Sequence, residues 1–141
     1  MCPRLRGYNV KLLTKEIERQ LRANADLPEE ERKPWLKLFG GGSCTWLLSE
    51  IVEGSQDDGG DMLLFGLCDL GMGFPELGYV SFNELRELKF PPFGLPIERD
   101  LHWSPSLSIG AYAEAARERG RIVDPMQEMS DLISRRVLGG R

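Results

Sequence analysis

Apolar residues near the start of the chain recur every four positions, at Leu13, Ile17 and Leu21. This spacing places them on one face of a helix, and Thr14 is of a residue type that caps helix N-termini. The pattern predicts a helix within residues 10–23. The next segment, residues 24–34, contains two prolines and three consecutive glutamates, so we expect a polar loop or a short helical turn there.

The middle of the chain consists of short apolar runs separated by segments rich in glycine and aspartate, which is typical of antiparallel strands. We expect strands over residues 35–39, 45–52, 62–68 and 76–80. The first two flank glycines 40–42 and form a hairpin. The third is a continuous apolar run bounded by turns at 54–61 and 69–75, which indicates a central strand.

Two further segments follow before the helical last third of the chain. Ser81 and Glu84 have the spacing of a capping box, which predicts a helix over residues 82–88. Prolines make residues 89–96 an irregular connection, and a last strand is expected over residues 97–103.

The last third of the chain has helical periodicity. One apolar stripe ends at a glycine stop and consists of Ile109, Tyr112, Ala113 and Ala116. A second helix begins at an aspartate-proline pair at 124–125, and its stripe consists of Met126, Met129, Ile133 and Val137.

Strands followed by helices, rather than strict alternation, predict an α+β fold. The expected architecture is a small antiparallel sheet of four to five strands with an N-terminal helix, a short capped helix and two C-terminal helices. A chain of 141 residues forms a single domain, 1–141.

The sequence indicates a cytoplasmic protein. It shows no export signal, and no apolar run approaches the roughly 20 residues of a membrane-spanning helix. Cys2, Cys44 and Cys68 are too widely spaced for a disulfide framework or a zinc site. We expect free thiols in structural roles, because His102 is the only histidine available to activate a cysteine.

The formal net charge of −4 disfavours general nucleic-acid binding. Arginines in the last two helices leave sequence-specific binding open, although helix surfaces account for them first. The acidic residues at 29–31 and at 57, 58 and 61 are compatible with mimicry of nucleic-acid phosphates, and a solvated loop explains them with fewer assumptions.

No cofactor is expected. Gly71 and Gly73 follow an apolar strand, but the third glycine of a dinucleotide fingerprint would fall at Glu76, whose carboxylate repels a pyrophosphate. Residues 40–45 lack the lysine of a phosphate loop.

One local pattern is compatible with metal binding. On a strand over residues 97–103, Glu98, Asp100 and His102 share one face and Arg99 lies on the other. Two carboxylates and an imidazole suit Zn, Mn or Fe. The alternative is that the acids are solvated or pair with arginines, because three ligands on one straight strand do not converge on a metal.

Large aromatic residues offer a second kind of site. Trp35 and Trp46 fall on paired strands and Trp103 ends the last strand, where packing is favoured over partner recognition. The candidate recognition surface consists of Trp46, Glu76, Tyr79, Glu98, Arg99, Asp100 and His102.

Several short blocks, above all residues 76–81 and 95–101 in this order and spacing, carry a family resemblance. Over residues 10–107 the chain resembles the domain-of-unknown-function family number 2958, and residues 108–141 form a C-terminal helical extension outside it. The resemblance implies that the protein is encoded on plasmids, integrative elements or phage-like regions of bacteria, together with accessory genes that include those of antirestriction proteins. Relatives carry another aromatic residue in place of His102, which argues against metal binding.

We therefore expect a non-catalytic binding protein of a bacterial mobile genetic element, without assigned catalytic, cofactor or metal residues. Its expected partner is another protein, such as a restriction or CRISPR complex of the host, and not a nucleic acid or a membrane. The alternative is a metal-dependent hydrolase or nuclease that uses Glu98, Asp100 and His102. The sequence does not determine the oligomeric state.

Overall fold

The computed structural model describes residues 11–55 and 61–138, and the side chains up to residue 136. Cys2, most of the predicted turn at 54–61 and the Val137 side chain therefore lie outside the described part. In chain order the elements are α2 (Lys15–Asn24), η1 (Glu29–Glu31), β1 (Leu36–Gly40), β2 (Cys44–Ile51), β3 (Leu63–Asp69), β4 (Glu76–Ser81), α3 (Phe82–Glu87), β5 (Lys89–Phe90), β6 (Leu95–Pro96), β7 (Glu98–Arg99), α4 (Ile109–Arg119) and α5 (Pro125–Leu138).

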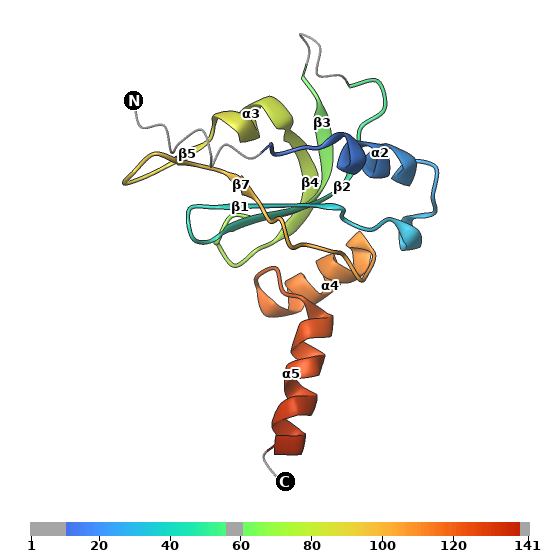
Figure 1. The fold of residues 1–141 in the computed structure, drawn as a ribbon, viewed down its shortest axis with the longest axis vertical. Helices are drawn as coiled ribbons and strands as arrows, with labels where there is room; N and C mark the ends of the chain where they lie inside the picture. The colour runs from blue at the N-terminus through green and yellow to red at the C-terminus, as the bar shows by residue number, and fades with distance from the viewer. Residues whose placement is uncertain (1–10, 56–60, 139–141) are drawn as a thin grey trace.

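The structure confirms the predicted α+β fold (Figure 1). Five strands form one sheet in the order β4-β3-β2-β1-β7, and every neighbouring pair is antiparallel. The hairpin predicted across glycines 40–42 joins β1 to β2. The strand predicted to be central, β3, lies inside the sheet beside the middle strand β2.

Each face of the sheet has its own apolar core. On one face Leu21 of α2 and two residues of α3, Phe82 and Leu85, join a cluster with the alternate strand residues that include Trp46 and Leu48. On the opposite face, α4 packs its predicted stripe against two strand residues, and this cluster consists of Leu47, Leu67, Ile109, Tyr112, Ala113 and Ala116. The sheet therefore lies between α2 and α3 on one side and α4 on the other.

The predicted helix starts are confirmed by their caps. Thr14 accepts a hydrogen bond from the N–H of Ile17 at 3.1 Å, and Ser81 accepts one from Glu84 at 3.1 Å. The predicted stop, Gly120, has φ of 72°, a left-handed conformation that glycine adopts without strain.

Strand β2 contains a β-bulge. Leu48 pairs with Gly66, but the next paired residue is Glu50, opposite Phe65, so Ser49 is an extra residue in the register. The bulge shifts the alternation of β2, so that Glu50 lies on the α4 side of the sheet and Ile51 belongs to the core on the other side.

The predicted last strand, residues 97–103, is largely wrong. Only Glu98 and Arg99 form β7, and the chain turns at Leu101 and His102. The predicted irregular segment 89–96 instead contains the two-residue strands β5 and β6, which pair with each other, and Pro96 is part of β6. A proline fits there because β6 is an edge strand.

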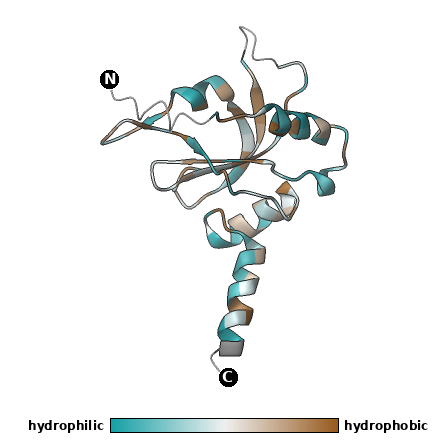
Figure 2. Ribbon diagram, in the orientation of Figure 1, coloured by the Kyte–Doolittle hydropathy of each residue, from teal (hydrophilic) through white to brown (hydrophobic). Residues whose placement is uncertain are grey.

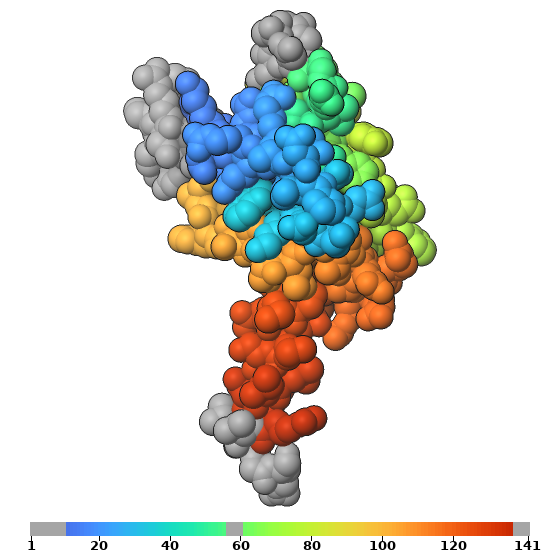
Figure 3. Space-filling model, turned by 90° about the vertical axis from the view of Figure 1, so that its right-hand side faces the viewer, coloured from blue at the N-terminus to red at the C-terminus, as the bar shows by residue number. Residues whose placement is uncertain are grey.

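Helix α5 leaves the body of the molecule as an arm (Figures 1 and 3). Figure 2 shows hydrophobic and hydrophilic residues alternating along it. Four of its described apolar side chains are at least half exposed, and these are Met126, Met129, Leu132 and Ile133. None of the described helices combines the length and the hydropathy that a bilayer-spanning segment requires.

Candidate functional site

The candidate residues from the sequence lie at opposite edges of the sheet. Glu98 and Arg99 form β7 at one edge, next to Asp100 and His102, whereas Glu76 and Tyr79 belong to β4 at the other edge. They do not form one surface.

Trp46 is not a surface residue. It is 3% exposed and belongs to the core beneath α2. Its alternation with Leu47 along β2 turns it away from the α4 side, so the predicted role in packing is confirmed and a role in partner contact is wrong.

Trp103 also has a structural role. Its indole N–H donates a hydrogen bond of 2.7 Å to the carbonyl oxygen of Pro34, and its ring lies 5.5 Å from that of Tyr112. The ammonium group of Lys37 lies 4.9 Å from the centre of the indole ring. Trp103 thus joins the chain before β1 to α4.

The one-face arrangement of Glu98, Asp100 and His102 is wrong. Because the strand ends at Arg99, the Asp100 carboxylate folds back, accepts a hydrogen bond of 2.9 Å from the His102 N–H and lies 3.6 Å from the Lys37 ammonium group. Across residues 11–55 and 61–138, no three side chains of the types His, Cys, Asp and Glu are grouped as metal ligands.

The described cysteines, Cys44 and Cys68, are free and half-buried, as expected. Burial raises the pKa of the Cys68 thiol to about 11. Burial, together with the negative charge of Asp69, raises the pKa of the Cys44 thiol above its ordinary value. Both thiols therefore hold their protons at neutral pH and are weak nucleophiles.

Helix α4 covers only part of its side of the sheet. It packs over Leu47 and Leu67, and beyond it the same face of β3 and β4 is partly exposed. We define the β3–β4 patch as the apolar and aromatic residues of this partly exposed region, which are Leu63, Phe65, Leu77 and Tyr79.

The β3–β4 patch centres on two aromatic rings. Phe65 and Tyr79 are cross-strand partners, and their ring centroids lie 5.1 Å apart at a tilt of 58°. The Tyr79 side chain is 69% exposed, although its neighbours along the strand alternate toward the opposite face. The patch thus presents a large aromatic surface to solvent.

A cleft of about 480 Å³ opens between this patch and the start of α4. Phe65 and Leu77 of the patch line it together with Ile109 and Ala111 of α4. We call it the acidic cleft, because its other lining side chains include four carboxylates, Glu29, Glu30, Glu50 and Glu114.

Among the residues that the structure describes, Arg32 is the one cation that lines the acidic cleft, and its guanidinium group already has partners. Its guanidinium group donates to Glu50 at 2.8 Å and to the carbonyl oxygens of Leu27 at 2.8 Å and Ala25 at 3.4 Å. It therefore neutralises Glu50 alone. Glu29, Glu30 and Glu114 form no ion pair within the part of the chain that the structure describes.

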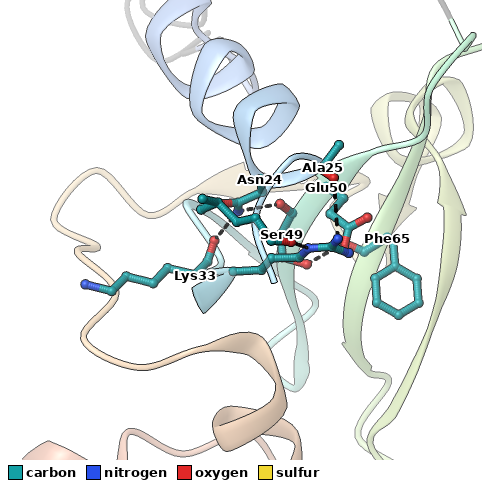
Figure 4. Close-up of polar contacts among 8 residues, drawn as sticks. Asn24, Ala25, Lys33, Ser49, Glu50 and Phe65 are labelled. Atoms are coloured by element: carbon teal, nitrogen blue, oxygen red, sulfur yellow. Dashed lines mark hydrogen bonds and ion pairs between the residues drawn. The ribbon is translucent and has the colours of Figure 1, made fainter. Parts of the chain in front are cut away.

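A buried side-chain amide fixes the loop that carries Glu29 and Glu30. The Asn24 side chain donates to the carbonyl oxygens of Lys33 at 2.9 Å and Ser49 at 2.7 Å, and Asn24 is 2% exposed. Figure 4 shows Asn24 between Lys33 and Ser49, with Glu50 close by. Together the hydrogen bonds of Asn24 and Arg32 hold the segment between α2 and β1 against the bulge of β2.

Of the recognition surface predicted from the sequence, Tyr79 lies in this site and Glu76 lies beside it on the same edge strand. Two of the acidic residues noted at 29–31, Glu29 and Glu30, line the acidic cleft. Sequence reasoning missed Phe65 and Leu77. Strand alternation places both residues on the same side of the sheet as Tyr79. It could not identify Phe65 as partly exposed, because residues 62–68 form a continuous apolar run in which buried and exposed positions look alike.

A sequence model of one protein family, described as "Protein of unknown function (DUF2958)", matches residues 12–123. The match extends beyond residues 10–107, on which the resemblance rests, and includes the whole sheet, both sides of the acidic cleft and α4. No curated protein and no solved structure shows significant similarity to the chain.

Proposed function

Because the chain belongs to the DUF2958 family of proteins of unknown function, whose match contains the β3–β4 patch and the acidic cleft, we propose that it acts by binding another protein at this surface. One observation carries the proposal: Phe65 and Tyr79 form an aromatic pair on a part of the sheet that α4 leaves exposed, where Tyr79 is 69% exposed and Phe65 is half-buried. The role is non-catalytic.

The composition of the surface supports this function. Tyrosine is enriched at the centres of protein interfaces, since its ring adds apolar contact area and its hydroxyl group keeps a polar partner. Around Tyr79, Leu63 and Leu77 are each about two-fifths exposed, so the apolar surface is continuous. Glutamates at the cleft supply the polar rim that such interfaces have.

The described nucleophiles favour binding over covalent chemistry. The thiols of Cys44 and Cys68 have raised pKa values, and both cysteines lie on the core side of the sheet, away from the β3–β4 patch. The patch itself contributes one ionisable side chain, the Tyr79 phenol.

The narrower proposal is that the partner belongs to a host defence complex in the bacterial cytoplasm, and that this protein serves a mobile genetic element. Two considerations support it: the genetic company that the family resemblance implies, and charge. Proteins that hold nucleic acid expose lysine and arginine, and a surface with unpaired glutamates complements them.

The test is site-specific photocrosslinking in the full chain. A benzophenone amino acid replaces Tyr79 in one variant and Phe93 in the other, because Phe93 is 82% exposed and lies in the β5–β6 turn outside the patch. We expect one host protein to be crosslinked from position 79 and not from position 93. Equal labelling from both positions, or none from position 79, would contradict the proposal.

The crosslinked protein is then purified and titrated by calorimetry. Removal of an exposed interface tyrosine costs on the order of 2 kcal/mol, so Tyr79→Ala should weaken binding about thirtyfold. Phe93→Ala is the matched control and should leave the dissociation constant unchanged. A Tyr79→Ala variant that binds as tightly as the native chain overturns the assignment of this surface.

A further inference from the structure

We infer that the partner contributes an extended segment with lysine or arginine side chains, which adds to the sheet as a strand beside β4 and places its cations at the acidic cleft. This inference rests on the proposed function and names the chemistry of the occupant. Three independent features carry it: the free edge of β4, the pattern of side chains next to it, and the charge of the cleft.

Strand β4 is an unprotected edge. It pairs with β3 over six residues and ends the sheet, and no described strand bonds to its outer side. Natural edge strands are protected by charged side chains, above all lysine, and by proline, bulges or short length. Residues 76–81 contain no lysine or proline, their one charged residue is Glu76 at the start of the strand, and their pairing with β3 is regular.

The opposite edge of the sheet provides the contrast. Strand β7 has two residues, and the chain turns directly after them at Leu101 and His102. A short edge that turns away offers little backbone for pairing. Of the two edges, only β4 has the length and the free backbone groups that a peptide strand requires.

An added strand would place alternate side chains beside the aromatic pair. Leu77 and Tyr79 point to the α4 side from β4, so every second residue of a neighbouring strand lies next to them on that side. A long side chain in that position passes over Leu77 into the acidic cleft, since Leu77 belongs to both surfaces.

The charge of the cleft selects the occupant. Glu50 is paired with Arg32, and Glu29, Glu30 and Glu114 have no ion pair with any described residue and surround an apolar floor. Lysine and arginine match both parts, because their aliphatic stems pack on apolar surface while the cationic ends reach a carboxylate. Their cations also interact favourably with the faces of aromatic rings such as Phe65 and Tyr79.

The same charge disfavours other occupants. Nucleic acid and anionic membranes would bring negative charge to three unpaired glutamates. A second copy of this chain, paired through β4, would bring its own acidic cleft to the interface, and like charges oppose such pairing.

The experiment uses the full chain and three fluorescein-labelled nine-residue peptides. The first alternates arginine with valine, the second has glutamate in place of arginine, and the third is the arginine peptide with methylated backbone nitrogens on one edge. We expect the arginine peptide to bind by fluorescence anisotropy, with an affinity that falls as salt rises. The other two should bind at least about tenfold more weakly, a difference of about 1.4 kcal/mol.

Variants locate the binding. Glu114→Gln removes one cleft carboxylate and should weaken the arginine peptide about fivefold, which is the effect of one partly exposed charge pair. Glu87→Gln removes the same charge from the exposed surface of α3 and should change nothing. Hydrogen exchange should show new protection of β4 amides when the arginine peptide binds.

Equal binding of the arginine and glutamate peptides, or no effect of backbone methylation, overturns the inference. If photocrosslinking from position 79 still captures one host protein, the proposed function stands and only the inferred chemistry of the partner fails. If the arginine peptide binds as expected but position 79 captures no protein, the inference about the edge stands and the proposed cellular role fails.

Discussion

Gly66 of β3 lies directly opposite Gly78 of β4, yet the two glycines differ in the space around them. A Cβ atom on Gly66 would lie 2.0 Å from the carbonyl oxygen of Leu47, whereas a Cβ atom on Gly78 would meet nothing within 4 Å. Gly66 therefore lets β2 and β3 approach closely at the bulge, and Gly78 has no such role.

This difference predicts opposite effects of the same substitution. Gly66→Ala forces backbone atoms apart and should destabilise the fold by about 3 kcal/mol or more. Gly78→Ala should stabilise it slightly, by up to about 1 kcal/mol, because alanine loses less backbone entropy than glycine on folding. Urea unfolding followed by tryptophan fluorescence measures both. Similar unfolding midpoints for the two variants would contradict the close approach at Gly66.

Asn24 should be a key residue for the stability of the loop before β1. In Asn24→Ala the buried carbonyl oxygen of Ser49 and the partly buried one of Lys33 lose their donor, which should cost about 2–4 kcal/mol. Asn24→Asp should cost more, since a carboxylate cannot donate to either oxygen. Calorimetric melting gives the values, and Gln127→Ala on the exposed surface of α5 is the control with no expected change. An Asn24→Asp variant as stable as the native chain would contradict the assignment.

The pKa of Cys68 predicts slow alkylation. Relative to an ordinary thiol with a pKa of 9.0, a pKa of about 11 lowers the thiolate fraction at neutral pH about a hundredfold. Iodoacetamide should therefore modify Cys68 about a hundred times more slowly in the folded protein than in urea, as followed by mass spectrometry of the Cys68 peptide. Equal rates in both conditions would disprove the shift.

The same shift has a consequence for stability. Between pH 9 and 11 the folded state keeps the Cys68 proton and the unfolded state loses it, so the free energy of unfolding falls as the pH rises through this range. Cys68→Ala should remove this part of the decline. The difference between the two chains in urea unfolding at pH 8.5 and pH 10.5 measures it, because the other titrating groups are common to both.

The C-terminal helices should differ in their contribution to folding. Truncation after Asp124 removes α5, whose described side chains are largely exposed and whose ion pair, Arg119 with Glu128, is exposed too. It should cost less than about 1 kcal/mol. Truncation after Leu107 removes α4, including the fully buried Tyr112, and should abolish cooperative unfolding. A large loss from the first truncation would show that α5 is part of the folded body.

The helices were predictable because their signals are local. The predicted caps at Thr14 and Ser81 act within three residues, and the stripe of α4 has the same members in the sequence and in the buried core. The strand predicted at residues 97–103 is largely wrong, because the alternation of side chains along a sequence does not show where pairing with the neighbouring strand stops. Strand β1 pairs with only Glu98 and Arg99, and the Asp100 side chain then stabilises a turn.

The candidate site was predictable only in part, because it depends on long-range packing. Tyr79 on a strand was visible in the sequence, but its exposure depends on how far α4 extends over the sheet. Trp46 was included in the predicted recognition surface, but the core beneath α2 encloses it. The cleft joins residues as distant in sequence as Glu30 and Glu114, which no local pattern links.

The bulge at Ser49 absorbs one extra residue of β2. If Ser49 instead paired regularly with Phe65, Glu50 would point into the apolar layer beneath α2, and Ile51 would lie on the side where Arg32 now finds its carboxylate. The chemistry of this surface thus depends on how the strand accommodates its length as well as on residue identity. Loss of the Ser49 codon would make the strand regular and leave Glu50 and Ile51 on their present sides of the sheet.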